Sequence, residues 1–247
     1  LSSIELLVDG PDIRGNLIAL YHPPPVEQAS YSETQSQVRD NEFSQENALI
    51  IGGSRGLGEV TAKFIAAGGG KSILTYSVGE AEAIKVQNEI TNGGSRCEIR
   101  QLTVNGKSSI PVNFPEFNQL YFFATPKIFG KRGNEFDQKR YEKLIEIYVN
   151  GFESICQSIV HQKRNLAVLY PSTTAIDEPI TELREYILSK KKGEDICDIL
   201  NKSNYLKIIH PRLPRIETDQ TSTFTGVKSH NAVEIILPLL KEMNLYL

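Results

Sequence analysis

The sequence has few of the residues that mark several common classes of protein. Its three cysteines lie far apart and indicate a reducing compartment, the cytoplasm, rather than a disulfide framework. No pair of its cysteines or four histidines has the spacing of metal ligands, so we expect no metal site. No run approaches the roughly eighteen apolar residues of a membrane span, and no signal peptide is visible. The net charge of −3 offers no basic surface, so we expect neither nucleic acid nor membrane as a partner.

The first 46 residues differ in composition from the rest of the chain. Residues 4–8 and 16–21 are apolar and predict short strands, whereas residues 27–46 are rich in Ser, Gln, Glu and Asn and predict a linker or a loosely attached arm. Residues 1–46 are therefore either an N-terminal extension that packs on the main domain, which we favour, or the end of a preceding domain. The chain begins with Leu1, as expected for a piece of a longer polypeptide.

Residues 47–247 alternate apolar runs typical of strands with stretches of helical spacing. This order predicts a Rossmann-like, doubly wound parallel sheet in the α/β class, with helices on both faces. The connection 103–118 looks shortened, at a place where a full crossover helix is usual. The expected strands are 47–51, 72–76, 97–102, 119–123, 166–170 and 205–209, and the expected helices are 57–68, 79–92, 138–162 and 179–202.

A glycine-rich turn follows the first of these strands and opens the first helix. Glycines at these positions allow a tight turn and close approach of the backbone to a phosphate, and the helix N-terminus attracts the negative charge. This pattern predicts a dinucleotide site, although a glycine-rich turn also simply joins strands to helices. Its residues are Gly52, Gly53, Ser54, Arg55, Gly56, Leu57 and Gly58.

The end of the second strand indicates which dinucleotide binds. An acidic residue there would hold the ribose 2′-OH of NAD, but the sequence has Tyr76 and Ser77. Arg55, inside the glycine turn, is placed to bind a 2′-phosphate. We therefore expect NADP(H) as the cofactor.

A second pattern lies more than a hundred residues later. Tyr186 and Lys190 are four residues apart, on one face of a predicted helix. The strand before that helix ends at Tyr170 and is followed by Ser172 and Thr173, which places hydroxyl groups at the carboxyl edge of the sheet, where ligands of such folds bind.

With these motifs in this order, residues 47–225 resemble the short-chain dehydrogenase/reductase family. The turn 52–58 is similar to its TGxxxGxG motif, Tyr186 and Lys190 to its YxxxK pair, Ser172 or Thr173 to its serine, and Asn150 to its helix asparagine. Thr173 has the family's usual separation of thirteen residues from Tyr186, whereas Ser172 matches in residue type, and we favour Ser172.

The resemblance implies an NADP(H)-dependent oxidoreductase that reduces a ketone. Tyr186 would protonate the carbonyl oxygen as hydride arrives, and Lys190 would lower the tyrosine pKa and hold the nicotinamide ribose. The serine or threonine hydroxyl would bind the substrate carbonyl, and Asn150 would support a water that leads protons to Lys190. Ala124, Thr125 and Thr218 would complete the cofactor site.

The sequence departs from the family pattern at several positions. Ile51 replaces the usual threonine, residues 122–126 replace the NNAG motif, and Thr103 stands where an aspartate often contacts adenine. These changes keep open a second interpretation, a nucleotide-binding or scaffolding module that has lost catalysis.

The substrate and the assembly are suggested by resemblance alone. The glycine turn is similar to that of acyl-carrier ketoreductases, so the expected substrate is a small carbonyl compound such as a carrier-bound β-ketoacyl thioester. We expect residues 219–230 to form a lid, and Arg212 and Arg215 either to bind an acidic substrate group or to be solvated. A homo-oligomer or a larger multidomain protein is expected as the assembly.

Overall fold

The computed structural model describes residues 2–21, 25–128, 135–222 and 227–246. Its centre is a parallel sheet of six strands in the order β5-β4-β3-β6-β7-β9. The order reverses between β3 and β6, and in folds of this kind ligands bind in a crevice at the carboxyl ends of the strands at such a point. The strands are β3 (Asn47–Ile51), β4 (Lys71–Tyr76), β5 (Cys97–Gln101), β6 (Gln119–Phe122), β7 (Leu166–Leu169) and β9 (Leu206–Ile209).

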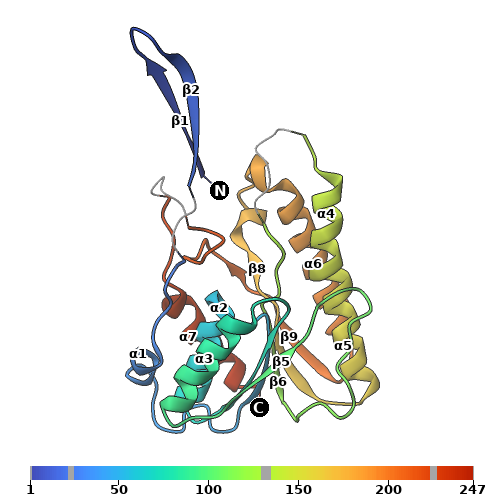
Figure 1. Ribbon diagram of the computed structural model, residues 1–247. Coiled ribbons are helices and arrows are strands. Elements are labelled where there is room, and N and C mark those ends of the chain that lie inside the picture. Colours follow the sequence, from blue (N-terminus) through green and yellow to red (C-terminus); the bar gives the residue numbers. More distant parts are fainter. Residues whose placement is uncertain (1, 22–24, 129–134, 223–226, 247) are drawn as a thin grey trace.

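Helices cover both faces of the sheet (Figure 1). Alternate residues of β3 enter separate hydrophobic clusters: Ile50 packs with α2, α3 and α7, while Leu49 packs with α5 and α6. This alternation is what a two-sided parallel sheet requires of a fully buried strand. The helices are α2 (Gly56–Ala67), α3 (Glu80–Asn92), α4 (Gln138–Ile145), α5 (Phe152–His161), α6 (Arg184–Leu200) and α7 (Ala232–Asn244). The prediction of a Rossmann-like α/β fold is confirmed.

The long helix expected over residues 138–162 is interrupted. Between α4 and α5 lies a π-helical turn, η1 (Glu146–Gly151). Such a turn inserts one residue into the helical repeat and is common at functional sites. It changes which side chains of this segment face α6.

The connection from β5 to β6 contains no helix, as its length predicted. Apolar side chains of the loop cover that part of the sheet instead. Ile110 and Phe117 are buried in the cluster that includes α5, with Phe114 packed edge-on against Phe117.

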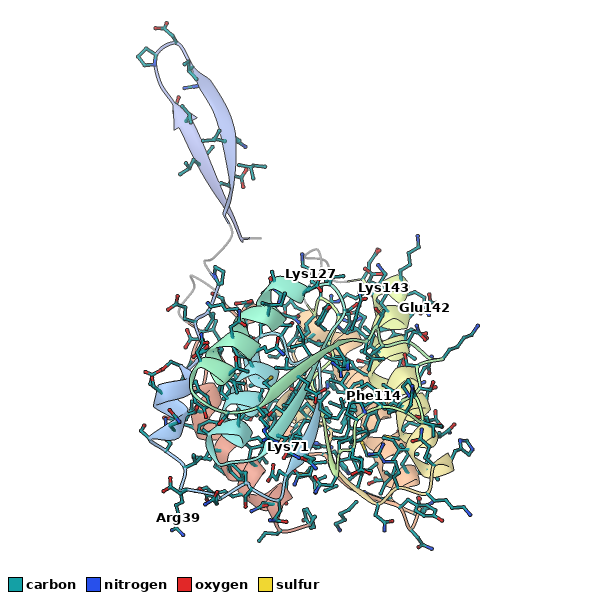
Figure 2. All side chains as sticks on the ribbon, turned by 60° about the horizontal axis from the view of Figure 1, so that its bottom comes forward. Arg39, Lys71, Phe114, Lys127, Glu142 and Lys143 are labelled. Carbon is teal, nitrogen blue, oxygen red and sulfur yellow. The ribbon has the colours of Figure 1, made fainter. Side chains whose placement is uncertain are left out.

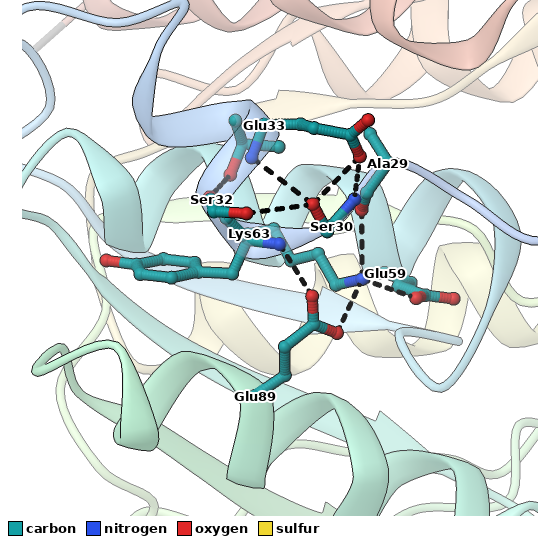
Figure 3. A network of polar contacts seen from close by, with 9 residues as sticks. Ala29, Ser30, Ser32, Glu33, Glu59, Lys63 and Glu89 are labelled. Carbon is teal, nitrogen blue, oxygen red and sulfur yellow. Dashed lines mark hydrogen bonds and ion pairs between the residues drawn. The ribbon is translucent and has the colours of Figure 1, made fainter.

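Most of the segment predicted to be a loose linker is packed against the sheet domain. Tyr31, in the short helix α1 (Tyr31–Gln35), and Phe43 are buried. Lys63 of α2 is also buried, and its ammonium group contacts the carbonyl oxygen of Ala29 at 3.0 Å and one carboxylate oxygen each of Glu59 and Glu89 at 2.8 Å (Figure 3). A backbone carbonyl of the arm thus joins an ion-pair network formed by α2 and α3.

The first two strands form a hairpin apart from this domain. β1 (Ser2–Asp9) pairs antiparallel with β2 (Arg14–Tyr21). The hairpin projects from the rest of the ribbon (Figure 1) and lies beyond the side chains packed around the sheet (Figure 2). Leu6, Leu17 and Ile18 are about half exposed or more. The two predicted strands are present, and the hairpin leaves apolar residues uncovered.

Two short strands complete the carboxyl edge of the sheet. β8 (Ser172–Thr173) pairs in parallel with β10 (Arg212–Leu213), and the 3-10 turns η2 (Thr174–Ile176) and η3 (Thr181–Leu183) lead from β8 to α6. Among the helices of the described residues, none combines the length and the apolar character needed to cross a membrane.

Candidate active site

The glycine turn between β3 and α2 is built for close backbone contact. Gly52 has a φ of +81°, and a β-carbon there would lie 2.7 Å from the backbone nitrogen of Ala124. A β-carbon on Gly58 would lie 2.5 Å from the carbonyl oxygen of Gly52. The N-cap residue of α2, Arg55, forms no side-chain cap hydrogen bond, so the first-turn N–H groups have no side-chain cap to satisfy them. This arrangement suits an anion such as a pyrophosphate.

The side chains of Ser54 and Arg55 extend from this turn toward the start of α3. A β-carbon on Gly79 would lie 3.0 Å from the Ser54 hydroxyl and 3.6 Å from an Arg55 guanidinium nitrogen. Arg55 is half exposed, and its guanidinium lies 3.7 Å from the carboxylate of Asp219. A cation thus stands beside the end of β4, where a 2′-phosphate would lie in this fold.

The residues at the end of β4 bond to neighbouring segments. The Tyr76 hydroxyl donates to Glu80 at 2.8 Å, which raises the tyrosine pKa, and Ser77 lies 3.0 Å from the hydroxyl of Thr103. Glu80 is a carboxylate close to this strand end that sequence reasoning did not consider, because it belongs to the following helix.

Tyr186 and Thr173 form the hydroxyl pair of the site. Both residues are largely buried at the carboxyl edge of the sheet. Burial raises the pKa of Tyr186 to about 12, and the Thr173 side chain close by opposes that rise. The phenol is therefore protonated at neutral pH and has a second hydroxyl beside it.

Ser172, the favoured candidate, points elsewhere. Its hydroxyl donates to the carboxylate of Glu194 at 2.5 Å, and Arg212 binds both oxygens of the same carboxylate, at 2.8 and 2.7 Å. These bonds lower the pKa of Glu194. Arg212 also pairs with Asp177, so this exposed guanidinium has two carboxylate partners within the protein.

Lys190 lies one turn after Tyr186 on α6, as the spacing predicted, but it is 4% exposed. Its ammonium group donates to the carbonyl oxygen of Pro171 at 2.7 Å. Burial lowers its pKa to about 7. The nitrogen lies 6.0 Å from the centre of the Tyr186 ring.

The structure does not bring Asn150 to Lys190. Asn150 is exposed on η1, and its side-chain amide donates to Glu146 at 3.0 Å. Tyr148, two residues earlier, faces Lys190 instead, with the lysine nitrogen 3.9 Å from the centre of its ring. The π-helical turn explains why Tyr148 rather than Asn150 faces Lys190, because it rotates the faces of the segment relative to a regular helix.

The remaining predicted cofactor residues gather around the crevice. Ala124 packs against Gly52, and the hydroxyl of Thr125 contacts that of Tyr148. The methyl group of Thr218 lies 3.5 Å from where a β-carbon on Gly56 would stand. Thr218 therefore lies over the N-terminus of α2.

The predicted lid is described in part, since residues 223–226 lie outside the described residues. Gln220 accepts a hydrogen bond from the backbone of Ile128 at 3.0 Å, which links this loop to the segment after β6. Arg215 donates to Ser229 at 3.1 Å and to the carbonyl of Thr221. Arg215 thus holds the loop together.

Sequence reasoning missed three residues of the site: Tyr148, Tyr170 and Glu194. Tyr and Glu are common in helices and at strand ends, and nothing in their local sequence distinguishes them. Within the described residues, no group of three or more His, Cys, Asp or Glu is arranged to hold a metal ion.

Comparison with solved structures places this geometry in a known fold. A short-chain dehydrogenase from Salmonella enterica serovar Typhi superposes with a TM-score of 0.70 at 15% identity, covering 84% of this chain and 93% of that one. The chain has the short-chain dehydrogenase/reductase fold.

Two further structures with this fold carry NADP. Landomycin C-6 ketoreductase, solved with NADP and rabelomycin, gives a TM-score of 0.66 at 14% identity and covers 84% and 91% of the two chains. A 3-oxoacyl (acyl-carrier-protein) reductase from Agrobacterium tumefaciens, solved with NADP, gives 0.59 at 16% identity and covers 74% and 76%. No protein-family profile and no curated protein sequence matches the chain.

Proposed function

We propose that this protein is an NADP(H)-dependent oxidoreductase that reduces a ketone to an alcohol. The observation that carries the proposal is the pairing of the Tyr186 and Thr173 hydroxyls, on the sheet edge that also bears the glycine turn. The turn fits a dinucleotide because its glycines leave no room for side chains against Ala124 and Gly52. The presence of NADP in structures of the same fold supports the choice of cofactor.

Tyr186, Thr173 and Lys190 each have a separate role in the proposed reaction. Bound NADPH would supply a hydride to the carbonyl carbon. Tyr186 donates its phenolic proton to the carbonyl oxygen, and the Thr173 hydroxyl donates a hydrogen bond to the same oxygen as negative charge develops there. The Lys190 ammonium stabilises the phenolate that remains on Tyr186. Together the hydride and the proton convert C=O to CH–OH.

Arg55 and Ser54 support NADP(H) over NAD(H). A guanidinium group binds a phosphate through charge-assisted hydrogen bonds, and Arg55 stands beside the end of β4, where the 2′-phosphate would lie. The proposed substrate class is β-ketoacyl thioesters, on the resemblance of the glycine turn to that of acyl-carrier ketoreductases.

The test is oxidation of NADPH, followed at 340 nm, with a panel of β-ketoacyl thioesters and simple ketones. We expect turnover of at least one compound, and loss of most of it in Tyr186→Phe, which keeps the ring and removes the proton donor. Turnover no greater than that of Tyr186→Phe with every compound would refute the proposal.

The second candidate is a nucleotide-binding module without catalysis. It is favoured by the position of Asn150, which faces solvent rather than Lys190. In that case NADPH would bind in a fluorescence titration, and Tyr186→Phe would change neither binding nor any activity of the protein.

A further inference from the structure

The ammonium group of Lys190 is enclosed by aromatic rings. Its nitrogen lies 3.9 Å from the centre of the Tyr148 ring, 4.7 Å from that of Tyr170 and 6.0 Å from that of Tyr186. Its hydrogen bond goes to the carbonyl oxygen of Pro171. A buried cation surrounded in this way is stabilised by the negative faces of the rings, as quaternary ammonium ligands are in aromatic cages.

Within the described residues no carboxylate forms an ion pair with Lys190, although the charge of Glu194 nearby acts to raise the lysine pKa against the effect of burial. On α6, the carboxylate of Glu194 is bound by Arg212 and Ser172, and Cys197 has a pKa raised by burial, so its thiol is neutral. Tyr186 on α6, Tyr148 on η1 and Tyr170 after β7 also have raised pKa values and are neutral phenols. The rings are therefore the groups in direct contact with the ammonium charge, while Glu194, bound to Arg212 and Ser172, acts on it from further away.

Both nearer rings are fixed in place. The Tyr170 hydroxyl donates to the carbonyl oxygen of Tyr148 at 3.0 Å, and the Tyr148 hydroxyl contacts that of Thr125. A β-carbon on Gly193 would lie 2.0 Å from the Tyr170 hydroxyl oxygen, so glycine there leaves the space that this ring occupies. The enclosure is thus held by hydrogen bonds and by close packing.

We propose that Tyr148 is a positioning residue whose ring keeps Lys190 charged and close to Tyr186. Its ring is the nearest of the three to the ammonium group, and it also packs edge-on against Tyr186, with 5.9 Å between ring centres. The catalytic consequence rests on the proposed function, because it concerns the proton donor Tyr186. The charge of Lys190 does not depend on that function.

The first test measures the pKa of Lys190 directly. Protein labelled with 13C at lysine Cε is titrated by NMR, and Lys190→Arg identifies the signal. Tyr148→Met fills the space with an apolar side chain that has no ring face. We expect the pKa of Lys190 to fall by about 1 to 1.5 units in Tyr148→Met, as a desolvated cation–π contact implies. Tyr148→Phe retains the ring, so the pKa there should stay within about 0.3 units of the unmodified protein.

A graded control covers the case in which Tyr148→Met does not fold. Tyr170→Met removes the more distant ring, and we expect a fall of less than 1 unit in the pKa of Lys190. An unchanged or higher pKa in a folded Tyr148→Met or Tyr170→Met protein would overturn the proposal, as would an equal fall in Tyr148→Phe.

The second test follows the pH dependence of NADPH-driven reduction. Because charged Lys190 supports Tyr186, the rate should fall as pH rises through the lysine pKa, and this fall should occur at lower pH in Tyr148→Met, by the shift that NMR measures. If the protein turns over no substrate, the proposed function fails, while the NMR titration still decides the role of Tyr148. A shifted lysine pKa with an unshifted rate profile would overturn the positioning role.

Discussion

The two neighbouring hydroxyls on β8 give the sharpest test of the site. Thr173 contacts Tyr186, whereas Ser172 bonds to Glu194, so replacement of each by alanine should have different consequences. Loss of one hydrogen-bond donor to a developing oxyanion lowers kcat by about 10² to 10³. We therefore expect Thr173→Ala to lose that much activity, and Thr173→Ser, which keeps the hydroxyl, to recover most of it.

Ser172→Ala should act on stability instead. The bond from Ser172 to the buried carboxylate is charge-assisted and contributes about 1.5 to 3 kcal/mol. Because Arg212 still binds both oxygens of Glu194, we expect a loss near the lower end, about 1.5 kcal/mol, and a fall in Tm of about 3 to 6 °C. The activity per folded molecule should stay within about threefold, because this hydroxyl faces away from Tyr186.

Steady-state kinetics with NADPH and the best ketone of the panel, together with thermal unfolding by circular dichroism, measure both effects. Equal losses of kcat in Thr173→Ala and Ser172→Ala would refute the division of roles. So would a kcat of Thr173→Ala within threefold of the unmodified protein.

Three other changes probe the cofactor site, the buried lysine and the arm. Arg55→Ala should weaken NADPH binding about 10- to 100-fold in a fluorescence titration and leave NADH nearly unaffected, because one charge-assisted contact to the 2′-phosphate is lost; equal weakening of both cofactors would contradict this. Lys190 binds fewer protons in the folded protein than in the unfolded one between its lowered pKa of about 7 and its ordinary value of 10.5. The free energy of unfolding in urea, taken as the difference between the unmodified protein and Lys190→Met, should therefore rise by about 1 kcal/mol per pH unit between pH 7.5 and 9.5. A difference that does not change with pH would exclude a lowered pKa of Lys190. Lys63→Met should lose about 2 to 3 kcal/mol and expose residues 25–46 to proteases, since two carboxylates and a carbonyl lose their partner; the exposed Lys71→Met serves as the control and should change little.

The sequence predicted the sheet well because its central strands, β3, β6 and β7, are buried on both faces. A continuous apolar run such as 48–51 is typical of a strand in a parallel sheet that helices cover on both faces. The glycine turn marks where this first strand ends. The arm was interpreted less well. Its buried aromatic residues, Tyr31 and Phe43, are separated by mostly polar ones, and its bonds to α2 and α3 include those of the backbone of Ala29 and Tyr31, a long-range pairing that leaves no local pattern.

The site could be predicted only where spacing along one helix decides it. Tyr186 and Lys190 are four residues apart on α6 and share a face, as the sequence indicated. The choice between Asn150 and Tyr148 depends on the π-helical turn, which the 3.6-residue repeat does not predict. The choice between Ser172 and Thr173 depends on strand alternation, because successive residues of β8 point to opposite sides, one toward Glu194 and the other toward Tyr186.

The arm that follows the hairpin touches both walls of the cofactor crevice. Ala29 binds Lys63 on α2, the helix that the glycine turn opens, and the backbone of Val26 donates to Asp219 at 2.8 Å, next to Thr218. Four residues of the arm thus join the helix that follows the glycine turn to the loop that carries Thr218.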